Sequence, residues 1–160
     1  MYDIKECISM IKEFNKDEGS IRTSEGTDLA QYKEKYKIGA DKDLLEGFYD
    51  EKNRFTAELI RVIVNTPSEE LHKNGITDIV HYFRTRHERS GTNKSHVCIF
   101  TQDGDYFTIV TSLIRKLPEY DTFMSLCTQI SAINEVPDKS ERISQNYLDF
   151  IKINGELEIG

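Results

Sequence analysis

The sequence predicts an α/β domain: a mostly parallel sheet flanked by helices, preceded by a helical N-terminal part. Three observations lead to this prediction. Residues 1–59 carry apolar side chains at helical spacing, as amphipathic helices do. Short apolar runs at 60–64 and 96–101 have the length and composition of buried strands. Helical spacing returns after each run, and strands that alternate with helices form parallel sheets covered on both faces.

The N-terminal part is expected to contain two amphipathic helices joined by a polar segment. Apolar residues from Ile4 to Phe14 recur at helical spacing, which predicts a helix over 3–15. Residues 16–40 are polar and contain glycines, so we expect a long irregular or partly helical stretch there. Asp41 is a suitable N-cap for a second helix that runs through Leu59.

Residues 60–88 are expected to supply the first strand and the helix after it. The run Ile60–Val64 stops at an Asn-Thr-Pro sequence and suits either a buried strand or the end of the preceding helix; we favour the strand. Apolar residues between Ile76 and Phe83 follow the i, i+3, i+4, i+7 pattern. A helix is therefore predicted from just after Gly75 to about Glu88.

The second predicted strand leads directly into an acidic turn and another helix. His96–Thr101 is a compact apolar run, and Gln102–Asp105 follows it at once. From Tyr106 to Leu117 the apolar residues recur at helical spacing, which predicts a strand, a turn and a helix in succession. Residues 122–127 suit either a strand or a helix, and a last helix is expected after Pro137.

Length and composition fit one cytoplasmic domain over residues 1–160, with a helical part (1–59) and an α/β core (60–152). Hydrophobic residues make up 38% of the chain, enough for a packed core. No apolar run approaches the ~20 residues that span a bilayer, and the N-terminus lacks a signal-peptide layout, so no membrane contact is expected. The three cysteines lack metal-ligand spacing and are expected to be reduced core residues.

The acidic turn, Asp103-Gly104-Asp105, is the most concentrated chemical feature of the chain. Two carboxylates this close need nearby donors or a cation if both are ionised. One interpretation is structural: Asp103 caps the following helix, and the glycine completes the turn. The other is a Mg²⁺ or Mn²⁺ site, because these cations are held by one or two carboxylates together with water and phosphate.

The residues around the acidic turn resemble a known family. The segment Val97–Phe107 is similar to the hallmark of NYN domains, the LabA-like branch of the PIN-like ribonucleases: an apolar strand, a Ser-Gly-Asp-x-Asp-Phe turn and a helix. Lys73–Ile79 is similar to the segment that opens the family's preceding helix, and Ser140–Ile151 is similar to its closing helix. The similarity covers about residues 60–152.

This resemblance implies a PIN-like, Rossmann-like fold and a metal-dependent ribonuclease. Asp78, Asp103 and Asp105 match family positions whose carboxylates gather around a divalent metal, here Mg²⁺ or Mn²⁺. The metal would activate water for cleavage of RNA. A basic cluster of Arg84, Arg86, Arg89 and Lys94 suits contact with the RNA backbone, and its alternative interpretation is a solvated helix end.

A non-catalytic protein-binding module is the alternative function. The net charge of −7 argues against a protein that grips nucleic acid over a broad face. PIN-like domains open with an apolar strand ending in aspartate, and residues 1–20 contain no such strand. These two observations favour an immunity, inhibitor or adaptor protein that binds a protein partner. The acidic turn favours the nuclease, and the sequence leaves both functions open.

Overall fold

A computed structural model describes residues 2–23, 29–39, 41–84 and 94–133 of the chain. In this part of the chain the three strands come after four α-helices and before a fifth. The helices α1 (Ile4–Thr23), α2 (Ala30–Lys35), α3 (Leu44–Val64) and α4 (Ser68–Lys73) come before the sheet. The strands are β1 (Ile76–Arg84), β2 (Lys94–Thr101) and β3 (Tyr106–Val110). The short 3-10 helix η1 (Thr111–Leu113) and the helix α5 (Tyr120–Ile133) follow them.

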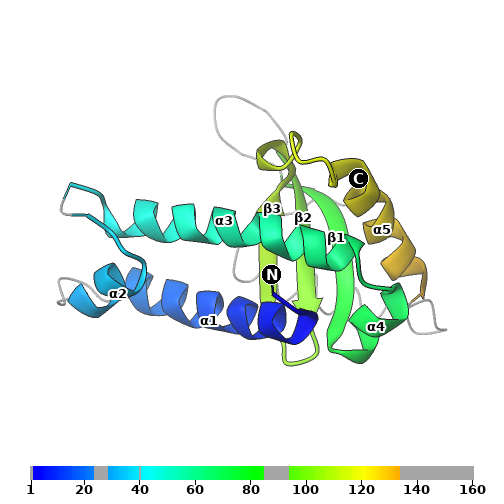
Figure 1. The fold of residues 1–160 in the computed structure, drawn as a ribbon, viewed down its shortest axis with the longest axis horizontal. Coiled ribbons are helices and arrows are strands. Elements are labelled where there is room, and N and C mark those ends of the chain that lie inside the picture. The colour runs from blue at the N-terminus through cyan, green and yellow to red at the C-terminus, as the bar shows by residue number, and fades with distance from the viewer. Residues whose placement is uncertain (1, 24–28, 40, 85–93, 134–160) are drawn as a thin grey trace.

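The three strands form an antiparallel sheet in the order β1-β2-β3, so the predicted parallel, Rossmann-like sheet is wrong (Figure 1). The strand predicted over 96–101 is confirmed as the central strand β2. Its connection to β3 explains the error in direction. A tight turn can only join antiparallel neighbours, because parallel strands need a long crossover between them.

Three predicted elements have a different secondary structure. Residues 60–64 are the last part of α3 and not a strand. The helix predicted to begin after Gly75 is strand β1. The helix predicted over 106–117 is strand β3 followed by η1. Residues 122–127 lie in α5, so the helical alternative was correct there. The helix predicted after Pro137 lies outside the described residues.

The N-terminal helices match the prediction more closely. The helix over 3–15 is confirmed and extends to Thr23 as α1. The second helix is α3, but its N-cap is Asp43 and not Asp41, since the Asp43 carboxylate accepts a hydrogen bond from the Leu45 N–H at 2.8 Å. A cap two residues later shifts the start of the helix and leaves its apolar stripe unchanged.

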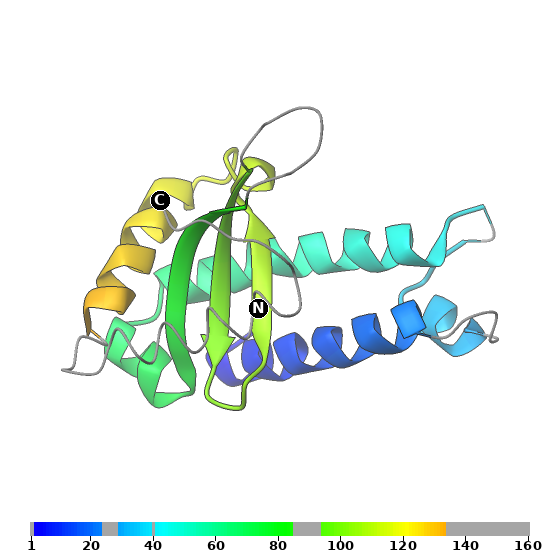
Figure 2. The same cartoon turned by 180° about the vertical axis from the view of Figure 1, so that it is seen from behind.

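The helices α1 and α3 cover one face of the sheet: they lie in front of the strands in Figure 1 and behind them in Figure 2. Ile79, Ile99 and Phe107 are direct neighbours across the three strands, and all three are fully buried in the core under the helices. The ring of Phe107 lies 6.3 Å from that of Phe14 on α1 and 5.5 Å from that of Phe55 on α3. This aromatic contact marks where both helices cross β3.

Both helices continue past the β3 edge of the sheet (Figures 1 and 2). Two helix segments lie beyond the aromatic contact: residues 15–23 of α1 and residues 44–54 of α3. We call these two segments together the overhang. At a rise of 1.5 Å per residue these segments extend about 14 Å and 16 Å beyond β3. The helices thus project over space in which the described sheet has no strand.

A buried carboxylate ties α2 to the overhang. Asp17 is only 4% exposed, and it accepts hydrogen bonds from the Tyr36 hydroxyl and from Lys35 Nζ at 2.5 Å. Burial, followed by the hydrogen bond to Asp17, holds the pKa of Tyr36 well above its ordinary value. The phenol therefore remains a proton donor, and the Asp17 charge stays satisfied.

Two glycines with open space around them give opposite predictions for the same substitution. Gly104 has a φ of 86°, so Gly104→Ala should lower the free energy of unfolding by about 1–2 kcal/mol through backbone strain. Gly19 lies inside α1, so Gly19→Ala should raise that free energy by about 0.5–1 kcal/mol. Urea unfolding measures both effects. Stabilisation by Gly104→Ala would contradict the left-handed turn.

Candidate functional site

The acidic turn is a hairpin loop between β2 and β3. The N–H of Thr101 donates to the Asp105 carbonyl at 2.9 Å, and the N–H of Gly104 donates to the Thr101 carbonyl at 3.1 Å. A turn closed by such a bond and completed by a left-handed glycine is a common hairpin connection. The predicted role of Asp103 as a helix cap is wrong, because a strand and not a helix follows the turn.

The three aspartates of the predicted metal site lie in different environments. Asp78 is fully buried on β1, opposite Phe100. Asp103 is 52% exposed, and its carboxylate binds Lys12 Nζ at 2.8 Å. That hydrogen bond is the main reason why the pKa of Lys12 is raised, and the charge of Asp105 adds to it. The turn's negative charge is thus partly balanced by a lysine.

No group of three or more His, Cys, Asp or Glu side chains is placed to hold a metal ion within the part of the chain that the structure describes. The Mg²⁺ or Mn²⁺ site of Asp78, Asp103 and Asp105 stays a prediction. The backbones of Arg84 and Lys94 pair in register at the ends of β1 and β2, so these two positions lie on strands and not at the expected helix end. Arg86 and Arg89 lie outside the described residues, so contact of the basic cluster with RNA also stays a prediction.

The cysteines are free and buried. Burial raises the pKa of Cys7 and of Cys127 to about 12, and it raises the pKa of Cys98 as well. A thiol that remains protonated is a poor nucleophile and a poor metal ligand. These side chains belong to the core, as the sequence predicts, and offer no reactive site.

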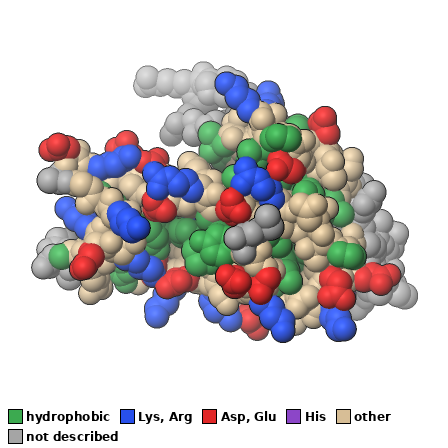
Figure 3. Space-filling model, viewed as in Figure 1, with side chains coloured by type: hydrophobic (Ala, Val, Ile, Leu, Met, Phe, Trp, Pro, Cys, Tyr) green, Lys and Arg blue, Asp and Glu red, His purple; other side chains and the backbone are tan. Residues whose placement is uncertain are grey.

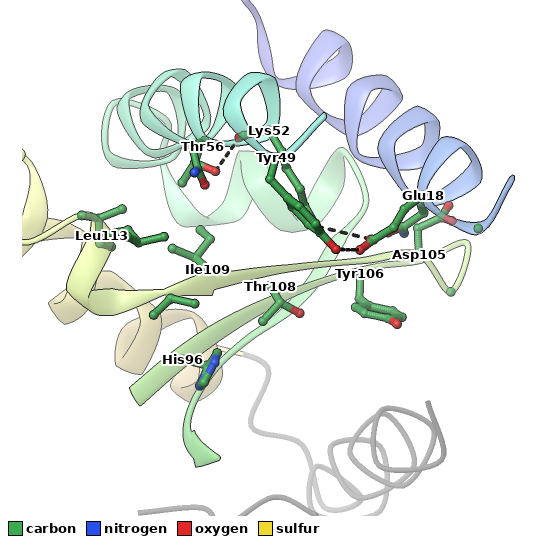
Figure 4. Close-up of a pocket in the computed structure, with 16 residues that line it drawn as sticks. Glu18, Tyr49, Lys52, Thr56, His96, Asp105, Tyr106, Thr108, Ile109 and Leu113 are labelled. Carbon is green, nitrogen blue, oxygen red and sulfur yellow. Dashed lines mark hydrogen bonds and ion pairs between the residues drawn. The ribbon is translucent and has the colours of Figure 1, made fainter. Parts of the chain in front are cut away.

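A groove of about 890 Å³ runs along the side of β3 that faces away from β2 (Figure 4). The overhang forms one wall of this groove and strand β3 forms the other. Asp105 lies at one end and Leu113 lies at the other (Figure 4). The groove therefore has the length of the strand and two chemically different ends.

Half of the β3 backbone faces this groove. In an antiparallel ladder, hydrogen-bonded residue pairs alternate with pairs that are not hydrogen-bonded. Thr101 and Asp105 are hydrogen-bonded across the hairpin, so every second residue of β3 after Asp105 is also hydrogen-bonded to β2. The N–H and C=O groups of Phe107 and Ile109 therefore point towards β2. The backbone groups of Thr108, the residue between them, point away from β2. None of the described strands lies on this side of β3.

A polar triad lines the wall formed by the overhang. The Tyr49 hydroxyl donates to Glu18 Oε1 at 2.6 Å, and Lys52 Nζ lies 3.6 Å from Glu18 Oε2 (Figure 4). Lys52 Nζ also lies 5.1 Å from the centre of the Phe107 ring. The side chains of Lys52 and Glu18 are only 14% and 24% exposed. The triad connects α1, α3 and β3 and leaves this wall without net charge.

Known proteins do not identify the site. Comparisons with protein-family models, curated proteins and solved structures find no match. The antiparallel sheet also differs from the parallel sheet that the NYN resemblance implies. Within the described residues no helix is long and apolar enough to cross a membrane.

Sequence reasoning missed the groove because it placed residues 106–117 in a helix. A hairpin signal was present, since Gly104 separates two apolar runs by a short polar loop. In the structure the strand alternates: Phe107 and Ile109 are buried, while Tyr106 and Thr108 are partly exposed. The other wall contains residues of α1 and α3, such as Glu18 and Lys52. These residues are far from β3 in the sequence, so no local pattern indicates that they meet it.

The triad predicts coupling between Glu18 and Lys52. Lys52→Met should lower the free energy of unfolding by about 2 kcal/mol, because it removes the cation that is paired with the shielded Glu18 carboxylate. Glu18→Gln added to Lys52→Met should recover part of this loss, since the carboxylate that Lys52 neutralised is then also uncharged. A double-mutant cycle by urea unfolding measures the coupling. Strict additivity of the two substitutions would show that the ion pair contributes nothing.

Proposed function

We propose that the protein is a non-catalytic binding module that accepts an extended segment of another protein as a fourth strand beside β3. One observation carries this proposal: outward-facing backbone groups of β3, including those of Thr108, border a groove beneath the overhang. In strand addition the main-chain hydrogen bonds supply affinity, and side-chain contacts supply specificity. The function corresponds to the protein-binding alternative that the acidic composition favours.

The sequence of β3 supports this proposal. Edge strands are usually protected from pairing by charged residues, proline, bulges or a covering element. Tyr106–Val110 contains no charged residue and no proline. Its aromatic and β-branched residues have high strand propensity. An edge of this composition is suited to pairing with another strand.

The overhang supplies a place for that strand. Neighbouring strands lie about 4.8 Å apart, so the ~14–16 Å of helix beyond β3 would cover an added strand completely. One face of the strand would contact the wall with Glu18, Tyr49 and Lys52. Hydrogen bonds formed under this cover are shielded from competing water, which strengthens them.

The nuclease prediction has less support than the binding module. It relied on a parallel sheet that would place Asp103 and Asp105 at the start of a helix, and the described chain has an antiparallel hairpin there. On the helix side of the molecule acidic and basic side chains are intermixed over α1 and α3, so this face offers no broad basic surface for RNA (Figure 3).

Proline at position 108 tests the proposed function. Thr108→Pro removes an N–H that faces the groove and leaves the hydrogen bonds of Phe107 and Ile109 to β2 in place. Panning a displayed library of short peptides on the wild type should enrich extended sequences. Their affinity for Thr108→Pro should fall by about tenfold or more, measured by fluorescence anisotropy, because a ladder bond is lost and the edge is sterically changed.

Thr108→Val is the matched control, since it keeps the N–H and a β-branched side chain, and it should bind the enriched peptides like the wild type. Urea unfolding should show that both variants are folded. The proposal fails if panning yields no peptide, or if the enriched peptides bind Thr108→Pro as tightly as the wild type.

A further inference from the structure

We infer that the partner strand runs antiparallel to β3, begins with an apolar residue beside Leu113 and ends with a basic residue beside Asp105. This inference rests on the proposed function and adds the chemistry and direction of the partner. It follows from the two unlike ends of the groove.

The turn end of the groove attracts a cation. Asp105 is the carboxylate of the turn that lines the groove, whereas Asp103 binds Lys12 at 2.8 Å. The ion pairs among the described residues do not include the Asp105 carboxylate, and Lys12, which is bound to Asp103, acts on Asp105 only through its charge. The Glu18–Lys52 pair on the overhang is neutral as a unit. A basic side chain is the complement of this end, and the net charge of −7 favours its approach.

The opposite end offers an apolar contact. Leu113 on η1 is 65% exposed, whereas its neighbour Ile114 is only 3% exposed. Both residues line the groove. Covering an exposed leucine with an apolar side chain removes area from water on both partners, which is favourable. The residue of the partner strand that reaches this end is therefore expected to be aliphatic or aromatic.

The direction follows from the existing sheet. Both strand pairs are antiparallel, and antiparallel pairing is slightly the more stable of the two. A strand antiparallel to β3 begins beside Val110 and Leu113 and ends beside Tyr106 and Asp105. Its apolar residue must then precede its basic residue.

A second copy of the same chain does not fit this place. In an antiparallel pair of β3 strands the two copies are related by a two-fold axis perpendicular to the sheet, so their helices lie on the same face. The overhang of each copy, ~14–16 Å long, would then enter the space held by α1 and α3 of the other. A strand that carries no helix layer at that position, from a different protein, avoids this collision.

Four blocked peptides test the inference against the full chain by fluorescence anisotropy at low salt. Each has a short Thr/Val centre: one begins with Leu and ends with Lys, one has that sequence reversed, one replaces Lys with Glu, and one replaces Leu with Ser. The Leu-first, Lys-last peptide should bind tightest. Replacing its Lys with Glu should weaken binding by about fivefold, a value typical of one partly exposed ion pair.

Two variants assign each preference to its end of the groove. Asp105→Asn should remove the preference for Lys over Glu and keep the preference for Leu over Ser. Leu113→Ser should do the reverse. High salt should reduce only the preference for Lys, because exposed ion pairs are screened.

The outcomes separate this inference from the proposed function. If all four peptides bind the wild type equally and Thr108→Pro weakens all of them, strand addition stands and the partner chemistry is wrong. If none binds, both are wrong. If the reversed peptide binds tightest, the direction is wrong. Sedimentation of the free wild type as a dimer that Thr108→Pro dissociates would make a second copy the occupant and overturn the inference.

Discussion

Contact among three phenylalanines fixes how the helices sit on the sheet, and the rest of the arrangement depends on it. Phe14 on α1, Phe55 on α3 and Phe107 on β3 meet pairwise with ring centres 5.3, 6.3 and 5.5 Å apart. Aromatic rings bury large areas and prefer offset-stacked or edge-to-face geometry, so the contact defines both position and orientation. It determines where the helices cross β3, and hence how much helix remains to form the overhang and the groove.

The sequence predicted the helices of the N-terminal part well and the segments that follow less well. Ile and Val at 60–64 favour a strand by composition, but they continue the buried stripe of α3, and packing outweighs the local preference. Residues 106–110 show the opposite case. Tyr106, Ile109 and Val110 match helical spacing, yet the turn at Gly104 brings this segment directly against β2, where ladder hydrogen bonds decide its conformation.

The sequence correctly predicts a turn at Asp103–Asp105, but the helix that it predicts after the turn is a strand. The chemistry of the turn depends on whether a strand or a helix follows Asp105, and spacing alone did not decide between them. The contact between Lys12 and Asp103 joins residues 91 positions apart, which no local pattern foresees. The groove is similar, because its walls come from segments far apart in the sequence, the overhang and β3, which meet only where the helices cross the sheet.

The same separation along the chain sets an order of assembly. α1, α2 and α3 pack on near neighbours in sequence, and the β2–β3 hairpin is closed by a few residues, so both can form through local contacts. Joining them closes a loop of about 90 residues, whose entropic cost is met only when the aromatic contact forms. We expect docking of the helices to be the late step. Until then the overhang does not cover the edge of β3, and the newly made chain is most prone to pair with other strands during that interval.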